Sequence, residues 1–261
     1  MAELTLGISP CPNDVYVFSG LLLGRVTAPG LTFAVDFQDV ETLNARAQAG
    51  TIDVVKISYA NYVHCRDRYD LLPCGGALGR GVGPLLLSNG GGWDPAAEVL
   101  VPGEFTTANF LLDFYAGRPL RKRFLPFDAL YARLQQEPGA QGVVIHEKRF
   151  TYMADRLRLI QDLGDYWERE TGFAIPLGAI AVRKGLDVEA LTEAVRESLR
   201  WAYAHDAEAF ALCREYAQDL NPDVVRAHIG LYVNDFSEDV GPEGQAAVDF
   251  FLERQQELQR K

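Results

Sequence analysis

The chain has few cysteines, no long apolar run and no excess of positive charge. Its 4 cysteines form no C-x-x-C pair and no cluster with metal-ligand spacing, so we expect reduced thiols, no disulfide framework and no metal site. No apolar run approaches the roughly 20 residues that a membrane-spanning helix needs. The formal net charge of -11 argues against nucleic acid and against anionic membrane surfaces as partners.

The first residues lack the basic and apolar segments of a secretory signal, so we expect a cytoplasmic protein. What is present is an ordinary globular composition, with 48% hydrophobic and 23% charged residues in a chain of 261. A chain of this length has room for one large domain or two modest ones. We find no internal repeat and no low-complexity tract.

The first 70 residues alternate between predicted strands and predicted helices. Strands are expected at residues 4–8, 31–37 and 52–57. One helix is expected to follow a cap at Asn13 or Asp14, a second to follow a cap at Asp39, and a third to cover residues 59–68. Asn and Asp are favoured caps because their side chains accept hydrogen bonds from the free N–H groups of a helix start. Such alternation predicts a parallel sheet with helices on both faces.

The pattern restarts after a linker at residues 88–92. Strands are predicted at residues 98–101, 142–145 and 177–182, a helix after Thr106, and helices throughout the chain beyond Asp187. If those last helices pack on the first unit, the chain crosses between units near Ser88 and near Gly178. We therefore predict an α/β protein with two lobes, a cleft between them and a helical C-terminal segment. Residues 1–88 and 178–261 would form the larger lobe and residues 89–177 the smaller one.

Polar residues follow four of the predicted strands. Ligands of open α/β sheets collect where strands end and helix N-termini present free N–H groups, so we expect these residues to meet at one cleft. The candidates are Asn13 and Asp14, then Lys56, Ile57 and Ser58, then Thr106, Thr107 and Ala108, and finally His146.

Each candidate also has a purely structural explanation. Thr106 and Ser58 are suitable helix caps, Lys56 can extend its ammonium to solvent, and the segment 9–14 can be a rigid turn. A lone histidine such as His146 is more often structural than catalytic.

His146 is nevertheless the strongest candidate for chemistry. A neutral imidazole accepts a proton near neutral pH, as a general base must, and this residue ends an apolar strand. The other histidines, His64, His205 and His228, fall in helical segments, and we expect them to be partly exposed or part of the core.

Several other chemistries are excluded by their motifs. Phe150 stands where the second histidine of the zinc-protease motif H-E-x-x-H would be, which excludes a zinc protease of this class. The glycine run at residues 75–83 lacks the G-K-[ST] of a P-loop and precedes a strand, which also excludes a dinucleotide fingerprint. Nothing in the sequence points to a bound cofactor.

Several short motifs occur together and in order along the chain. They are Ser9-Pro-Cys-Pro-Asn-Asp14, Asp39-Val-Glu-Thr-Leu-Asn44, Lys56-Ile-Ser-Tyr59, Gly75-Gly-Ala-Leu-Gly-Arg-Gly-Val-Gly-Pro84, Val101-Pro-Gly103 with Thr106-Thr107, Ile145-His-Glu-Lys-Arg-Phe-Thr-Tyr152, Pro176-Leu-Gly-Ala-Ile180 and Tyr232-Val-Asn-Asp-Phe-Ser237. Each is weak alone, but the ordered set closely resembles the 1,4-dihydroxy-6-naphthoate synthases of the futalosine route to menaquinone. The resemblance covers nearly the whole chain.

The resemblance implies a fold like that of the type II periplasmic binding proteins, used for catalysis. It implies a small carboxylate substrate, cyclic dehypoxanthine futalosine, and the products 1,4-dihydroxy-6-naphthoate and dihydroxyacetone. The proton acceptor of the family falls on His146. Substrate contacts fall on Lys56, Ile57 and Ser58, and on Thr107 and Ala108 with Thr106 beside them.

A carboxylate substrate requires a local positive site in this acidic protein. Lys56 and helix N-terminal amides can supply it, and Arg80 or Arg149 are weaker candidates. Two other functions stay open: a non-catalytic binding protein for an acidic metabolite, and chorismate dehydratase of the same pathway. Whether Cys11 contacts the substrate, and whether the chain is a monomer or a homodimer, are open as well.

Overall fold

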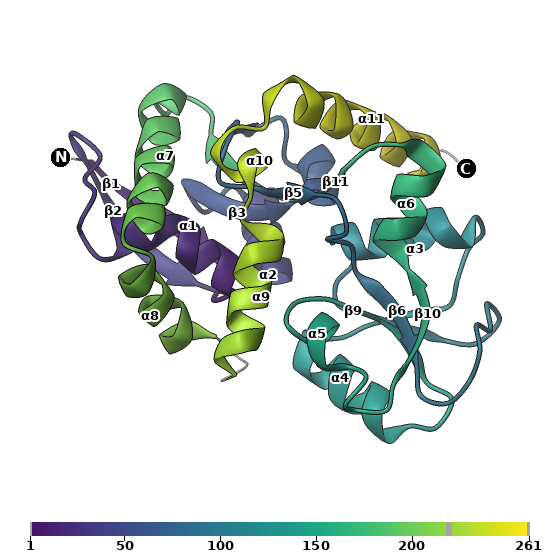
Figure 1. The fold of residues 1–261 in the computed structure, drawn as a ribbon. Helices are drawn as coiled ribbons and strands as arrows, with labels where there is room; N and C mark the ends of the chain where they lie inside the picture. Colours follow the sequence, from purple (N-terminus) through teal and green to yellow (C-terminus); the bar gives the residue numbers. More distant parts are fainter. Residues whose placement is uncertain (1, 218–220, 260–261) are drawn as a thin grey trace.

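A computed structural model describes residues 2–217 and 221–259 and places them around two mixed sheets (Figure 1). The six-stranded sheet has the order β2-β1-β3-β11-β4, with β5 also paired to β11. Its strands are β1 (Ala2–Ile8), β2 (Leu31–Phe37), β3 (Val54–Ser58), β4 (Tyr69–Leu71), β5 (Ala77–Gly79) and β11 (Ile175–Arg183). Together with the helices that pack on it, this sheet forms the first lobe.

Helices cover both faces of the first sheet, as predicted. The alternating residues Leu4, Leu6 and Ile8 of β1 are buried against α1 (Pro12–Leu22) and α7 (Val188–Ala204). On the opposite face, a Cβ atom added to Gly7 would lie 2.8 Å from Leu43 Cδ2, which belongs to α2 (Val40–Ala49). β1 therefore packs against helices on both sides, and its ends are held in place.

The prediction of a parallel sheet is only half correct. β1 pairs in parallel with β2 and β3, but β11 runs antiparallel to β3, β4 and β5. β11 brings the chain back from the second lobe, so its direction is set by that return and not by a helical crossover. The alternation of apolar residues along a strand carries no information on this direction.

Some of the predicted helix starts are confirmed and others are wrong. Asp39 caps α2 by accepting hydrogen bonds from the N–H groups of Glu41 and Thr42, as expected. The expected cap by Asn13 or Asp14 is wrong, because α1 begins at Pro12 with Cys11 as its N-cap residue. Proline is well tolerated in the first turn, where no backbone donor is needed. The helix predicted over residues 59–68 is a short 3-10 helix, η1 (Tyr59–His64).

The five-stranded sheet forms the second lobe and has the order β10-β6-β9-β7-β8. Its strands are β6 (Leu85–Ser88), β7 (Val99–Val101), β8 (Lys122–Phe124), β9 (Gln141–Val144) and β10 (Arg158–Asp162), and its helices are α3 (Thr107–Ala116), α4 (Phe127–Gln136), α5 (Lys148–Thr151) and α6 (Leu163–Thr171). Since β5 and β6 belong to different sheets, the chain leaves the first lobe within residues 80–84. Since Gly178 pairs with Ser58 in the first sheet, the return precedes β11. Both crossings come earlier in the chain than the predicted Ser88 and Gly178.

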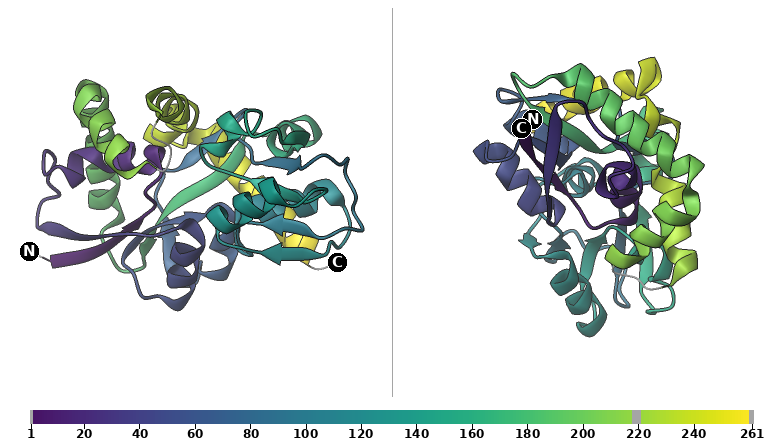
Figure 2. Two further views of the ribbon diagram at one scale, coloured as in Figure 1. Left: turned by 90° about the horizontal axis from the view of Figure 1, so that it is seen from below. Right: turned by 90° about the vertical axis from the view of Figure 1, so that its left-hand side faces the viewer.

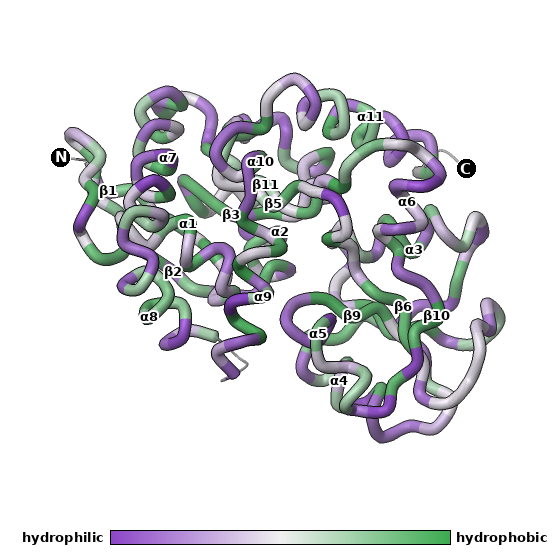
Figure 3. Tube along the Cα trace, viewed as in Figure 1, coloured by the Kyte–Doolittle hydropathy of each residue, from purple (hydrophilic) through white to green (hydrophobic). Residues whose placement is uncertain are grey.

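The C-terminal segment is helical, as predicted, and consists of α8 (Asp206–Tyr216), α9 (Pro222–Tyr232), α10 (Asp235–Glu238) and α11 (Gly241–Gln259). α11 crosses the junction of the lobes (Figures 1 and 2). The Phe251 ring lies 4.5 Å from that of Phe110 in α3, and Gln255 Nε2 donates a hydrogen bond to Ala60 O of η1. Hydrophobic residues concentrate along the strands of both sheets (Figure 3). Within the described residues, no helix is both long and apolar enough to cross a membrane.

The first crossing depends on two glycines in direct backbone contact. A Cβ atom at Gly83 would lie 2.2 Å from Gly164 Cα, at the start of α6. We expect Gly83→Ala to lower the free energy of unfolding by about 1–3 kcal/mol, because the backbones must separate. Urea denaturation measures this loss. Gly91→Ala is the control, since a Cβ atom there meets no atom within 4 Å, and equal midpoints for both variants would contradict the prediction.

Candidate active site

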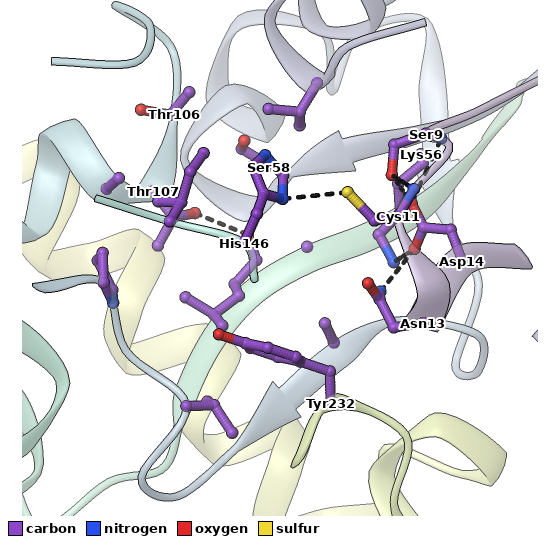
Figure 4. A pocket seen from close by; sticks show the side chains of 18 of the residues that line it. Ser9, Cys11, Asn13, Asp14, Lys56, Ser58, Thr106, Thr107, His146 and Tyr232 are labelled. Atoms are coloured by element: carbon purple, nitrogen blue, oxygen red, sulfur yellow. Dashed lines mark hydrogen bonds and ion pairs between the residues drawn. The ribbon is translucent and has the colours of Figure 1, made fainter. Parts of the chain in front are cut away.

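A cavity of about 130 Å³ lies between the lobes (Figure 4). The ends of β1, β3 and β9, the start of α3, the middle of β11 and one face of α9 supply its walls. All the predicted site residues line this one cavity, namely Asn13, Asp14, Lys56, Ile57, Ser58, Thr106, Thr107, Ala108 and His146. The convergence of the segments is thus observed, while the binding and catalytic roles of the residues stay predictions.

Asp14 and Lys56 form a buried ion pair in the wall. Lys56 Nζ lies 2.7 Å from Asp14 Oδ1, and both side chains are less than a tenth exposed. The carboxylate also accepts hydrogen bonds from the Ser9 hydroxyl at 2.6 Å and from Asn13 Nδ2 at 2.8 Å. Burial of an ion pair is tolerated only when further hydrogen bonds satisfy its charges, and here they do. The pair ties the first turn of α1 to β3.

This pairing changes the expected source of positive charge. Lys56 does not extend to solvent, and its charge is balanced by Asp14, so it is not a free cation for a substrate. The two arginines named as weaker candidates do not line the cavity. Arg80 pairs with Glu168 and Glu243 at the surface, and Arg149 pairs with Asp162 at 2.7 Å.

The start of α3 supplies the second polar part of the wall. Thr106 is its N-cap, and its hydroxyl accepts a hydrogen bond from Asn109 N and donates one to Gly103 O. The Thr107 hydroxyl donates to Leu177 O at 2.8 Å. Both hydroxyls are therefore used in hydrogen bonds within the protein. The backbone N–H groups of Thr107 and Ala108 occupy the first turn, where a helix offers no internal acceptor, so this helix end presents about half a positive charge to the cavity that both residues line.

Ser58 adds a hydroxyl next to this helix start. Its Oγ accepts a hydrogen bond from Asn44 Nδ2 at 3.2 Å, and its backbone N–H donates to Asn44 Oδ1 at 2.9 Å. Ser58 is the N-cap residue of η1, but its side chain makes no capping bond. Within the described residues its hydroxyl accepts a hydrogen bond and donates none, which leaves its proton for a ligand.

His146 follows β9 in a left-handed backbone conformation with φ 59°. Such a conformation is uncommon for residues other than glycine and indicates a constrained position. The ring edge packs on Phe127, and Nδ1 lies 3.0 Å from the sulfur of Cys11 (Figure 4). Burial lowers the pKa of His146 to about 4, against a weaker opposing effect of Asp14. The imidazole is therefore neutral at physiological pH.

Cys11 is a neutral partner of this ring. Burial raises the pKa of its thiol well above the ordinary value, and the nearby Glu147 and Asp14 act in the same direction. A thiol in this environment is not activated as a nucleophile. The contact with His146 therefore orients the ring and does not form a thiolate–imidazolium pair.

His228 and Tyr232 of α9 are among the wall residues that were not predicted from the sequence. His228 was expected to be a partly exposed or core residue, and it is indeed only 2% exposed, but it lines the cavity. The available signal was the helical spacing of Val225, His228 and Tyr232, which places them on one buried face. That spacing does not indicate what the face packs against. Within the described residues, no three His, Cys, Asp or Glu side chains come together as a metal site.

Comparison with known proteins identifies the family. The family described as "Menaquinone biosynthesis" matches residues 4–257. The chain belongs to this family. Two members named 1,4-dihydroxy-6-naphthoate synthase are similar over nearly their full length. The protein from Thermus thermophilus is 46% identical over 95% of this chain and 92% of its own, and that from Streptomyces coelicolor is 41% identical over 96% and 92%.

Solved structures agree with the fold expected for the family. The protein AF1704 from Archaeoglobus fulgidus superposes with a TM-score of 0.93 at 27% identity, covering 99% of this chain and 98% of its own. The periplasmic aliphatic sulphonate binding protein SsuA from Escherichia coli gives a TM-score of 0.64 at 13% identity, covering 98% and 94%. The second likeness concerns the fold alone. It confirms the expected periplasmic-binding-protein-like architecture.

The buried ion pair predicts a specific pattern of stability. Lys56→Met leaves the Asp14 carboxylate buried without its cation, so we expect a loss of about 3–5 kcal/mol in the free energy of unfolding. Adding Asp14→Asn removes the unpaired charge, so the double variant should regain most of the loss. Chemical denaturation of the single and double variants measures both effects. Additive losses would show that the two side chains do not depend on each other.

Proposed function

We propose that the chain is a 1,4-dihydroxy-6-naphthoate synthase that cleaves cyclic dehypoxanthine futalosine into 1,4-dihydroxy-6-naphthoate and dihydroxyacetone in the cytoplasm. The observation that carries this proposal is the neutral, oriented His146 ring in the same cavity as the α3 N-terminus. The names of two relatives at 46% and 41% identity support the choice of reaction.

The substrate carboxylate would bind at the start of α3. The N–H groups of Thr107 and Ala108 and the hydroxyl of Ser58 can donate to its oxygens, and the helix end adds its partial charge. Lys56 would take part through a proton that is not shared with Asp14. Ile57 would contribute an apolar contact to the ring system.

The chemistry would start with proton removal by His146. In the tautomer that can act as a base, Nδ1–H donates to the Cys11 sulfur and Nε2 takes a proton from the sugar-derived ring. A carbon–carbon bond then breaks in retro-aldol fashion, and the electron pair passes to an oxygen stabilised by hydrogen-bond donors of the cavity. Aromatisation of the bicyclic product makes this cleavage favourable.

The cavity volume bears on how the substrate is admitted. A volume of about 130 Å³ lies below the roughly 300–1,000 Å³ of pockets for drug-sized ligands. We propose that the lobes separate to admit the substrate and close to exclude water from the reactive intermediate.

Incubation of the purified protein with cyclic dehypoxanthine futalosine tests the proposal. We expect the naphthoate chromophore to form, and we expect His146→Asn to lower kcat by about 10²–10⁴-fold because the general base is lost. The control is His205→Asn, an exposed histidine that stacks on Trp201 outside the cavity. Binding without turnover would favour a binding protein, and turnover of chorismate instead would favour the dehydratase.

The lowered pKa of His146 predicts an unusual pH profile. We expect kcat/KM to stay nearly constant from pH 7.5 to 5.5, since the free base is protonated only near pH 4. An ordinary histidine with a pKa near 6.5 would lose about tenfold over this range. A tenfold decline would contradict the assigned environment of His146.

Stability should be measured at each pH as a control. The unfolded histidine binds a proton near pH 6.5 and the folded one only near pH 4, so between these values the unfolded state binds more protons. The free energy of unfolding therefore falls as the pH drops below 6.5. Activity must be compared only where thermal melts show the protein folded.

A further inference from the structure

His228 presents a buried nitrogen atom that no described residue uses. The side chain is only 2% exposed and lines the cavity, yet its Nδ1 has no hydrogen-bond partner among the described residues. More than about nine-tenths of buried polar groups in proteins are paired, because an unpaired one costs about 1–3 kcal/mol. An unpaired nitrogen in the wall of a binding cavity is therefore a position where a ligand atom is expected.

A chain of hydrogen bonds fixes which His228 nitrogen carries the proton. Asp14 accepts from Lys56, so the Asn13 group that faces Asp14 at 2.8 Å must be the donating Nδ2. Asn13 Oδ1 then faces His228 Nε2 at 2.9 Å, and an amide oxygen only accepts. The proton must therefore sit on Nε2 of His228.

The same series of hydrogen bonds leaves Nδ1 of His228 as an acceptor. Burial, with a smaller effect of the nearby His146, lowers the pKa of His228 to about 3, so the ring is neutral and holds one proton. With that proton on Nε2, Nδ1 has a free electron pair. A carboxylate oxygen placed there would meet a second acceptor and be repelled, whereas a hydroxyl would find a partner.

We propose that His228 is a substrate-contacting residue that accepts a hydrogen bond at Nδ1 from a hydroxyl of the sugar-derived part of the substrate. The identity of that substrate rests on the proposed function. His228 lies on α9 of the first lobe, while the anion-binding amides lie on α3 of the second. The α9 wall would therefore bind a hydroxyl donor of the substrate, and the α3 wall would bind its carboxylate. Together the two contacts would orient the substrate toward His146.

Two substitutions separate this role from a structural one. The amide of His228→Gln reaches the place of Nε2, so it keeps the donor to Asn13 and loses the acceptor in the cavity. The shorter amide of His228→Asn lies near the place of Nδ1, so it keeps an acceptor in the cavity and loses the donor to Asn13. A substrate contact through Nδ1 therefore predicts that His228→Asn is the more active variant, whereas a purely structural role predicts that His228→Gln is the more active one.

We expect His228→Gln to lower kcat/KM roughly 5- to 150-fold, the fold-change that corresponds to one buried hydroxyl left unpaired. His228→Asn should keep the higher kcat/KM of the two, although it should be the less stable in thermal melts. A His228→Gln variant as active as the wild type, or more active than His228→Asn, would overturn the inference. If the wild type forms no naphthoate at all, the proposed function fails instead.

The proton position can be tested without turnover. Nitrogen NMR of the ligand-free protein distinguishes protonated from unprotonated ring nitrogens, and with only 4 histidines the His228 signals can be assigned by their loss in His228→Gln. We expect a proton on Nε2 and none on Nδ1 at neutral pH. A protonated Nδ1 would overturn the inference whatever the substrate is.

Discussion

The arrangement of the site depends on the buried contact between the Asp14 carboxylate and the Lys56 ammonium. Two charges can lie in this wall only because each satisfies the other and because Ser9 and Asn13 use the remaining carboxylate positions. The contact connects the first turn of α1 to β3 and, through Asn13, to His228 of α9. It fixes the direction of the hydrogen bonds from Asp14 through Asn13 to His228, and hence leaves the buried Nδ1 of His228 as an acceptor.

The same contact bears on the proposed binding of a carboxylate, because it leaves Lys56 without a free positive charge. With Lys56 balanced by Asp14, attraction for a carboxylate would come from backbone N–H groups at the α3 N-terminus, whose partial charge is fixed by the fold. Both histidines of the cavity are neutral because burial disfavours their charged forms. A neutral ring can take up a proton at His146 or accept a hydrogen bond at His228, which a permanently charged side chain cannot do.

The parts of the fold that follow from local chemistry were predictable from the sequence. β2 has the predicted bounds, and Asp39 and Thr106 cap the helices expected of them, because strand alternation and capping involve neighbouring residues. β10 was missed because it is an exposed edge strand without an apolar run, with Leu159 47% exposed. The antiparallel direction of β11 was missed because it is set by the path of the chain through the second lobe.

The residues of the site also divide into those that can be located from their sequence neighbours and those that only the folded structure brings together. Residues that directly follow a strand, such as His146, could be located because the ends of sheet strands are the usual place for ligands. His228 could not, since α9 reaches the cavity by packing against α1, more than 200 residues earlier in the chain. The pairing of Lys56 with Asp14 was hidden for the same reason, although each residue alone was a candidate.

A crystal structure of the His146→Asn variant with cyclic dehypoxanthine futalosine would show directly which groups of the protein hold the substrate. We expect the ligand in the cavity between the lobes, with its carboxylate on the N–H groups of Thr107 and Ala108 and a hydroxyl on Nδ1 of His228. A ligand bound instead in the larger pocket that is lined by His64, Glu104 and Gln255 would contradict this proposal. So would a ligand in the reverse orientation, with its carboxylate toward His228.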